Sequence, residues 1–182
     1  GNGIAKASQR GRCKIAVPLP EIDGHDSEEL SIAATEAAIL TSYRYREFKA
    51  APPEFVELKE ILLAAPVNIA AATMRAQKVA DATCWARDLV NTPSNMKRPD
   101  SLAENAREMA VETGLEFEII DSGKAQQLGL NALLAVGQGS SVGPRLVILE
   151  HRPMGATGQP TVIVGKGITF DTGGISLKPA QK

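Results

Sequence analysis

The residues of this chain best suited to chemistry are Lys166, Asp171 and Lys178, which share one glycine-rich stretch. The stretch reads TVIVGKGITFDTGGISLKP from Thr161 to Pro179, and it opens with an apolar run. We expect this run to be a strand that delivers Lys166 and Asp171 at its carboxyl end, where open α/β sheets bind their ligands. The glycines around both residues indicate tight turns or a close approach to a bound group. The stretch therefore predicts a ligand site.

Three other interpretations compete for this part of the chain. In the first, Asp171 caps a glycine-rich turn and both lysines are solvated. The second is a phosphate loop, G-x-x-x-x-G-K-[ST], but the chain has Pro160 and Gly167 where that motif needs Gly and then Ser or Thr. The third is a dinucleotide fingerprint in GQGSSV at 137–142, where Val142 replaces the last glycine. Both phosphate motifs are therefore disfavoured.

The segment GKGITFDTGGISLKP resembles the active-site stretch of the leucyl (cytosol) aminopeptidases. A second segment, ARDLVNTPSN at Ala86–Asn95, resembles the linker motif of the same family. Weaker similarity occurs in TEAAILTSYRYREFK (Thr35–Lys49), which resembles a helix late in the family's amino-terminal domain, and in VGQGSS (Val136–Ser141). The resemblance thus extends through most of the chain.

The resemblance implies a role for each of the three chemical residues. Lys166 corresponds to a metal ligand, Asp171 to a carboxylate shared by two divalent ions, and Lys178 to a catalytic cation that stabilises the tetrahedral intermediate. The implied ions are Mn or Zn, with Mg as a third candidate, and such a pair activates water and polarises the substrate carbonyl. Carbonate is expected in the complete family site. A lysine ligates only as a neutral amine, which sets Lys166 apart from the charged Lys178.

The activity implied by the resemblance is the release of amino-terminal residues from peptides by metal-activated water, with Leu-like residues preferred. A homohexamer is implied as well. No Asp or Glu follows Asp171, whereas two ions need several further ligands, so we expect this chain alone to be incomplete and inactive. Two alternatives stay open, a non-catalytic interaction module of the same fold and a phosphate-binding α/β enzyme.

Composition excludes several classes of partner. The chain is 43% hydrophobic and 23% charged, which is typical of a soluble folded protein. Its 20 basic and 21 acidic residues leave a net charge of -1, so no bulk field attracts nucleic acid or an anionic membrane. We therefore expect peptide substrates, with neither nucleic acid nor membrane as a partner.

Cysteine and histidine usage points to a reducing setting and to other metal ligands. Cys13 and Cys84 are far apart and form no C-x-x-C pair, which favours a cytoplasmic location. His25 and His151 are isolated, and no H-E-x-x-H motif is present. We assign neither histidine to a metal.

The expected fold class is α/β: the end of an α/β amino-terminal domain (1–66), a long linker helix and linker motif (67–95), and the first part of a mixed-sheet α/β catalytic domain (96–182). Apolar runs predict strands at Cys13–Leu19, Phe55–Ala64, Leu115–Ile120, Leu146–Leu149 and Thr161–Val164, with the last two buried on both faces of a parallel sheet. Helical periodicity predicts helices at Ser27–Phe48, Asn68–Val90, Pro99 to Gly114 and Lys124–Leu128.

The sequence also predicts which helix faces and ends are important. The core-facing residues of the first helix are expected to be Leu30, Ala33, Ala34, Ala37, Ala38, Thr41 and Tyr45, and those of the second Met74, Val79, Ala82, Ala86 and Leu89. Ser101 and Glu104 are expected to form a capping box, with Gly114 as the opposite cap. We expect Asp88 and Asn91 to serve helix termination and interdomain contacts rather than catalysis.

Overall fold

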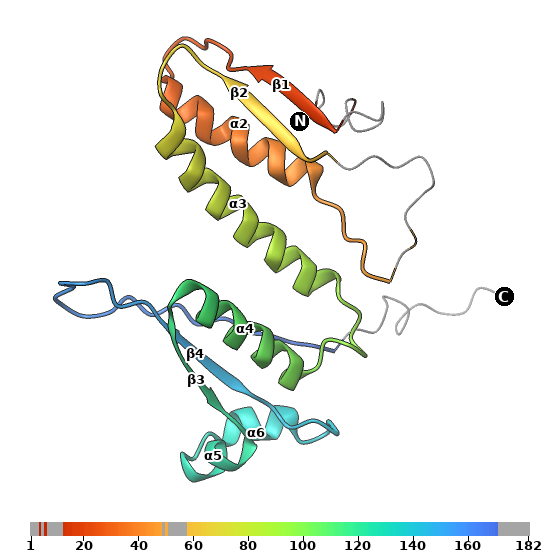
Figure 1. Ribbon diagram of the computed structural model, residues 1–182. Helices are drawn as coiled ribbons and strands as arrows, with labels where there is room; N and C mark the ends of the chain where they lie inside the picture. Colours follow the sequence, from red (N-terminus) through yellow and green to blue (C-terminus); the bar gives the residue numbers. More distant parts are fainter. Residues whose placement is uncertain (1–3, 5, 7–12, 49, 51–57, 171–182) are drawn as a thin grey trace. The chain divides into compact units, whose positions relative to one another are not determined.

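The computed structural model describes residues 4, 6, 13–48, 50 and 58–170. The chain divides into two compact units, Gly1–Asn91 and Thr92–Lys182, each of which is described by itself (Figure 1). Both units combine helices with strands, so the expected α/β class is confirmed. Within the described part of the chain, no helix is long and apolar enough to cross a membrane.

The first unit combines a parallel strand pair with two long helices. Strand β1 (Lys14–Pro18) pairs with β2 (Glu60–Ala64), with Lys14 opposite Glu60. Parallel strands need a long connection, and helix α2 (Ser27–Ser42) lies within it. Helix α3 (Ala70–Asn91) follows β2 and runs beside α2 (Figure 1). The predicted strand at Phe55–Ala64 is therefore a shorter strand that begins at Glu60, and its residues 55–57 lie outside the described part.

Helix α2 begins as its sequence predicts but ends earlier. The Asp26 side chain caps it by accepting a hydrogen bond of 2.8 Å from the Glu29 N–H. Two acidic residues occupy the first turn, where they interact favourably with the helix dipole. The predicted end at Phe48 is wrong, because the chain leaves helical geometry at Tyr43 (φ -55°, ψ 133°). The Tyr43 N–H still donates to the Ile39 carbonyl at 3.0 Å, so the helix closes there.

Helices α2 and α3 pack against each other through small residues. The buried residues are Ser31, Thr35 and Ala38 on α2 and Ala72, Ala76 and Ala80 on α3. Both hydroxyls bond to carbonyls of their own helix, Ser31 to Glu28 and Thr35 to Ser31, each at 2.7 Å. A buried hydroxyl that is hydrogen-bonded in this way carries no desolvation penalty of an unpaired group, so these polar residues can lie in a helix interface.

The face predicted for α2 is therefore only partly correct, and most residues of the face predicted for α3 are exposed. Ala33 and Ala37 of α2 are exposed, and Met74 and Val79 of α3 are 61% and 54% exposed. Ala38 is correct. The reason is steric. Small side chains spaced three or four residues apart let the two helix backbones approach closely, so the helices bury these residues and leave larger apolar side chains at the surface.

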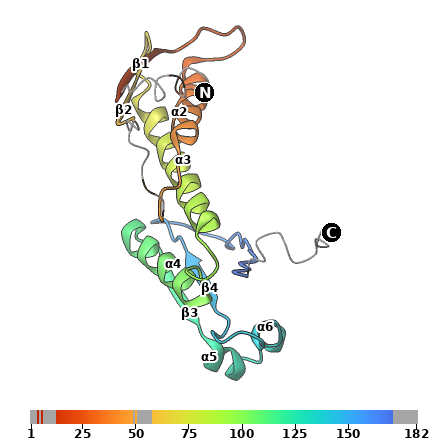
Figure 2. The same cartoon turned by 90° about the vertical axis from the view of Figure 1, so that its right-hand side faces the viewer.

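The second unit packs one helix on an antiparallel strand pair. Helix α4 (Pro99–Thr113) contacts both β3 (Glu116–Ile120) and β4 (Leu146–Glu150), and helices α5 (Ser122–Gln127) and α6 (Asn131–Gly137) connect the strands (Figure 2). Glycines in the left-handed region follow two of these helices, Gly114 at φ 74° after α4 and Gly129 at φ 71° after α5. The predicted cap at Gly114 is confirmed. Helix α6 was not predicted.

Strand β4 exists as predicted, but its orientation and burial differ from the prediction. It pairs antiparallel with β3, with Glu116 opposite Glu150 and Ile120 opposite Leu146. An antiparallel pair needs only one covered face, and Ile148 remains 41% exposed. The two facing glutamates would repel, but Arg152 bonds to Glu150 at 2.6 Å and lies 4.0 Å from Glu116. This arginine also lowers the pKa of Glu150, mainly through the hydrogen bond.

The run Thr161–Val164 is not a strand in the structure. Residues 159–170 belong to no helix or strand, and Val162, Ile163 and Val164 are 75%, 91% and 90% exposed. A strand exists only through its ladder of hydrogen bonds, and no described strand pairs with this run. The prediction of a buried strand is therefore contradicted for these residues.

Candidate metal and catalytic site

Of the three predicted site residues, only Lys166 lies in the described part of the chain. Its side chain is exposed and follows the apolar run directly, between Gly165 and Gly167. Asp171 and Lys178 lie outside the described residues. The structure therefore places the first member of the predicted site and does not test how the three come together.

The segment around Lys166 passes close to helix α4. A Cβ added to Gly167 would lie 3.5 Å from Leu102 Cδ2, which is ordinary contact, whereas one added to Gly165 would meet nothing within 4 Å. Gly167 therefore lies against the first turns of α4, and Gly165 is in open space. The beginning of α4 is thus the nearest described support for the segment that carries Lys166.

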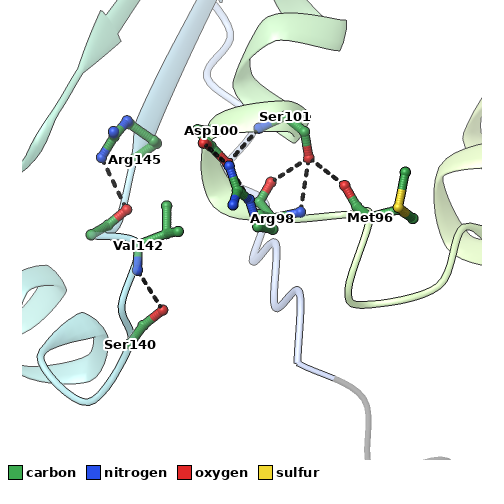
Figure 3. A network of polar contacts seen from close by, with 8 residues as sticks. Met96, Arg98, Asp100, Ser101, Ser140, Val142 and Arg145 are labelled. Atoms are coloured by element: carbon green, nitrogen blue, oxygen red, sulfur yellow. Dashed lines mark hydrogen bonds and ion pairs between the residues drawn. The ribbon is translucent and has the colours of Figure 1, made fainter.

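A compact polar network fixes the beginning of α4 (Figure 3). Ser101 Oγ accepts from the Arg98 N–H at 2.8 Å and lies 2.9 Å from the Met96 carbonyl, to which it donates. The Arg98 guanidinium pairs with Asp100 at 3.2 and 2.7 Å. That hydrogen bond lowers the pKa of Asp100, and the Ser101 N–H, 3.0 Å from the carboxylate, contributes further.

This network corrects the predicted capping box. Arg98 is the amino-terminal cap, and Ser101 is the third helical residue that bonds back to it. Glu104 does not take part in the cap but pairs with Arg107 one turn along. The prediction placed Ser101 at the cap itself, which is wrong. The predicted opening of the helix at Pro99 is confirmed, and the fixed φ of proline suits this first helical position.

The described residues do not by themselves fit a two-metal centre. No group of three or more His, Cys, Asp and Glu side chains suited to an ion occurs among residues 4, 6, 13–48, 50 and 58–170. Lys166 offers one exposed amine there, while a divalent ion needs several nitrogen or oxygen ligands. Any such centre must therefore draw on Asp171 and on groups beyond the described part.

Two of the three glycines of VGQGSSVG, Gly137 and Gly143, serve close packing in the described structure. A Cβ on Gly137 would lie 2.5 Å from Pro144 Cδ, and one on Gly143 would overlap Ser122 Oγ. Ser122 Oγ is itself buried without a described hydrogen-bond partner. Both glycines are thus explained by the approach of the 138–145 loop to α5 and α6, and neither needs a bound phosphate.

Replacing Gly143 with Ala is expected to destabilise the second unit by about 1–3 kcal/mol, because the added methyl group overpacks a contact with Ser122. Gly139→Ala is the matched control, since a Cβ there would meet nothing within 4 Å. Urea unfolding followed by circular dichroism measures both. Equal midpoints for the two variants would contradict the packing role.

Two polar residues of the linker motif make contacts inside the first unit. Asp88 and Asn91, both at the end of α3, bond to the Tyr43 hydroxyl at 2.7 and 3.0 Å. The helix ends at Asn91, one residue beyond the predicted end at Val90, and the interdomain contacts remain a prediction. Tyr43 was not singled out from the sequence. The available signal was the spacing of Asp88 and Asn91, which places both polar groups on one helix face where they require a partner.

Cys84 lies in a hollow of about 850 Å³ formed by α2, β2 and α3 in the first unit. Burial raises the pKa of its thiol, although nearby Arg87 opposes the shift. The thiol is therefore a poor nucleophile at neutral pH, because the thiolate is the reactive form.

The arrangement of helices and strands places the chain in the mixed α/β class. Residues 84–182 match the model of the cytosol aminopeptidase family, catalytic domain. A probable cytosol aminopeptidase of Syntrophotalea carbinolica is 42% identical over 154 residues, which are 81% of this chain and 31% of that protein.

Two solved structures are similar to the chain. The bottromycin maturation enzyme BotP in complex with Mn is similar with a TM-score of 0.73 and 32% identity, covering 83% of this chain and 32% of BotP. A mutant of tomato leucine aminopeptidase has a TM-score of 0.65 and 25% identity, covering 80% of this chain and 31% of that one.

The chain belongs to the cytosol aminopeptidase family. It spans about a third of the length of the relatives it matches.

Proposed function

We propose that the protein carrying this chain is a two-metal aminopeptidase that releases amino-terminal residues, Leu-like ones preferred, from peptides. The observation that carries the proposal is family membership. An uninterrupted GKGITFDTGGISLKP stretch supports it, because it contains the lysine, aspartate and second lysine to which the resemblance gives these roles. Exposure of Lys166 supports the proposal, because its amine is accessible.

In this proposal each of the three side chains has a separate task. Lys166 and Asp171 would hold the ions, the first through its neutral amine and the second through its carboxylate. Lys178 remains charged and stabilises the oxyanion that develops on the scissile carbonyl. When bound, a pair of divalent ions supplies an activated water and polarises the carbonyl. The glycines on either side of Lys166 leave its amine uncrowded.

The proposal extends to the ions, the assembly and the location. Mn or Zn are the proposed ions, with Mg as a third candidate, and the Mn complex of BotP supports the first of these. Carbonate in the complete site, a homohexamer and a cytoplasmic setting follow from the family resemblance alone. The chain alone is proposed to be inactive, because Lys166 and Asp171 are too few ligands for two divalent ions.

Hydrolysis of leucine 4-nitroanilide by the protein expressed from its complete gene tests the function. We expect release of nitroaniline that depends on added Mn and is lost in a chelator. The acetylated substrate N-acetyl-leucine 4-nitroanilide is the control, because an aminopeptidase requires a free amino group. Equal rates with both substrates, or thermal stabilisation by nucleotide without metal, would contradict the proposal.

A further inference from the structure

Four residues from two helices form a polar cluster at the end of α3. The Tyr43 hydroxyl donates to Asp88 Oδ1 at 2.7 Å and accepts from Asn91 Nδ2 at 3.0 Å. The Arg87 guanidinium lies over the Tyr43 ring, 5.5 Å from its centroid. We call Tyr43, Arg87, Asp88 and Asn91 the Tyr43 cluster. Three of its members belong to the linker motif, and the proposed chemistry uses none of them.

Arg87 also completes the end of α2. The last carbonyls of a helix have no partner within it. In α2, Ile39 O accepts from the Tyr43 N–H at 3.0 Å and Thr41 O from Arg44 Nη1 at 3.0 Å. Leu40 O accepts from Arg87 Nη1 at 3.1 Å. Two sets of hydrogen bonds therefore join the ends of α2 and α3. Arg87 of α3 donates to the last turn of α2, and Tyr43, directly after α2, bonds to Asp88 and Asn91 of α3.

The position of the cluster in the chain is informative. Helix α3 ends at Asn91, and the boundary between the two compact units falls between Asn91 and Thr92. Directly beyond, the Met96 and Lys97 N–H groups fold back onto the Pro93 carbonyl at 2.9 and 2.8 Å. The last residue held by Tyr43 is thus the last residue of the first unit.

We propose that the Tyr43 cluster is a latch that keeps the final turn of α3 helical up to Asn91 and thereby fixes the residue at which the chain leaves the first unit. Without it, that turn would fray, because terminal turns open first and none of its residues, 88–91, is buried. Partial burial of the phenol and its bond to Asp88 raise its pKa, so the hydroxyl remains a donor through the neutral range.

Hydrogen exchange measured by mass spectrometry on the complete protein tests the latch. Tyr43→Phe removes only the hydroxyl and is expected to speed exchange of the amides of residues 88–92 about tenfold, the size expected for two lost hydrogen bonds. Exchange at Ala72–Ala80, in the middle of α3, should not change. Tyr45→Phe is the matched control, because Tyr45 Oη bonds to Glu47 within its own segment at 3.4 Å.

Asn91→Ala provides a second variant at an exposed position. This variant should speed amide exchange in the same residues. The double variant Tyr43→Phe, Asn91→Ala should exchange little faster there than Tyr43→Phe alone, because both substitutions disrupt the same cluster. Unchanged exchange at 88–92 in both single variants would overturn the latch. So would an equal increase along the whole of α2 and α3, which would mean general loss of stability.

Discussion

Asp171→Asn is expected to lower kcat by about 1000-fold or more in the complete protein, the effect of losing several kcal/mol of metal-ion assistance. Asparagine keeps the shape of the side chain but loses the charge that would hold two dications. Steady-state hydrolysis of leucine 4-nitroanilide at saturating Mn measures the change.

Asp81→Asn is the control for this variant, because it makes the same substitution at an exposed position of α3. It should retain parental kcat. The assignment of Asp171 would be wrong if the Asp171 variant turned over substrate at a rate close to that of the Asp81 variant.

Lys178→Met should lower kcat by about 100- to 1000-fold, which is the usual cost of removing one oxyanion donor. Methionine has a similar length and no charge. Because Lys178 is proposed to lie beyond direct contact with the ions, metal binding should be retained and KM should change little. Lys166→Met should behave differently and lose ion affinity, since Lys166 is proposed as a ligand.

Lys78→Met is the matched control for the loss of a positive charge, because Lys78 is an exposed lysine of α3. Parallel kinetics and metal titrations of the Lys178, Lys166 and Lys78 variants separate the roles. Loss of ions in the Lys178 variant with an unaltered turnover of its metal-loaded fraction would reverse the assignment of the two lysines.

The sequence predicted best where structure depends on local chemistry. The start of α2 at Ser27, the opening of α4 at Pro99 and its cap at Gly114 are observed. Each depends on a side chain or a backbone angle within a few residues, such as the Asp26 carboxylate or the left-handed φ of Gly114. Such features can be read from sequence because no distant partner is needed.

Features that depend on distant partners were not predicted. The buried faces of α2 and α3 are chosen by how closely two helices approach, which selects residues such as Ser31 and Ala76 over Met74. The antiparallel pairing of β4 depends on β3, twenty-odd residues earlier in the chain. Tyr43 likewise acquires its role only through Asp88 and Asn91 on another helix.

For the candidate site, motif resemblance was more informative than periodicity. It led to the family that the comparisons establish, whereas the predicted strand before Lys166 is absent from the described residues. A strand forms only when its backbone groups hydrogen-bond to a neighbouring strand, which the local sequence does not specify. A motif depends only on which residue types stand at which positions, so it can be recognised without that partner. The roles of Lys166, Asp171 and Lys178 remain proposals.

The most direct test is the number of Mn ions bound per chain by the complete protein, measured by elemental analysis after gel filtration, with and without Asp171→Asn. We predict two ions in the parent protein and loss of at least one in the variant. Two ions retained by the variant at parental affinity, together with unchanged peptide hydrolysis, would contradict a shared carboxylate at position 171.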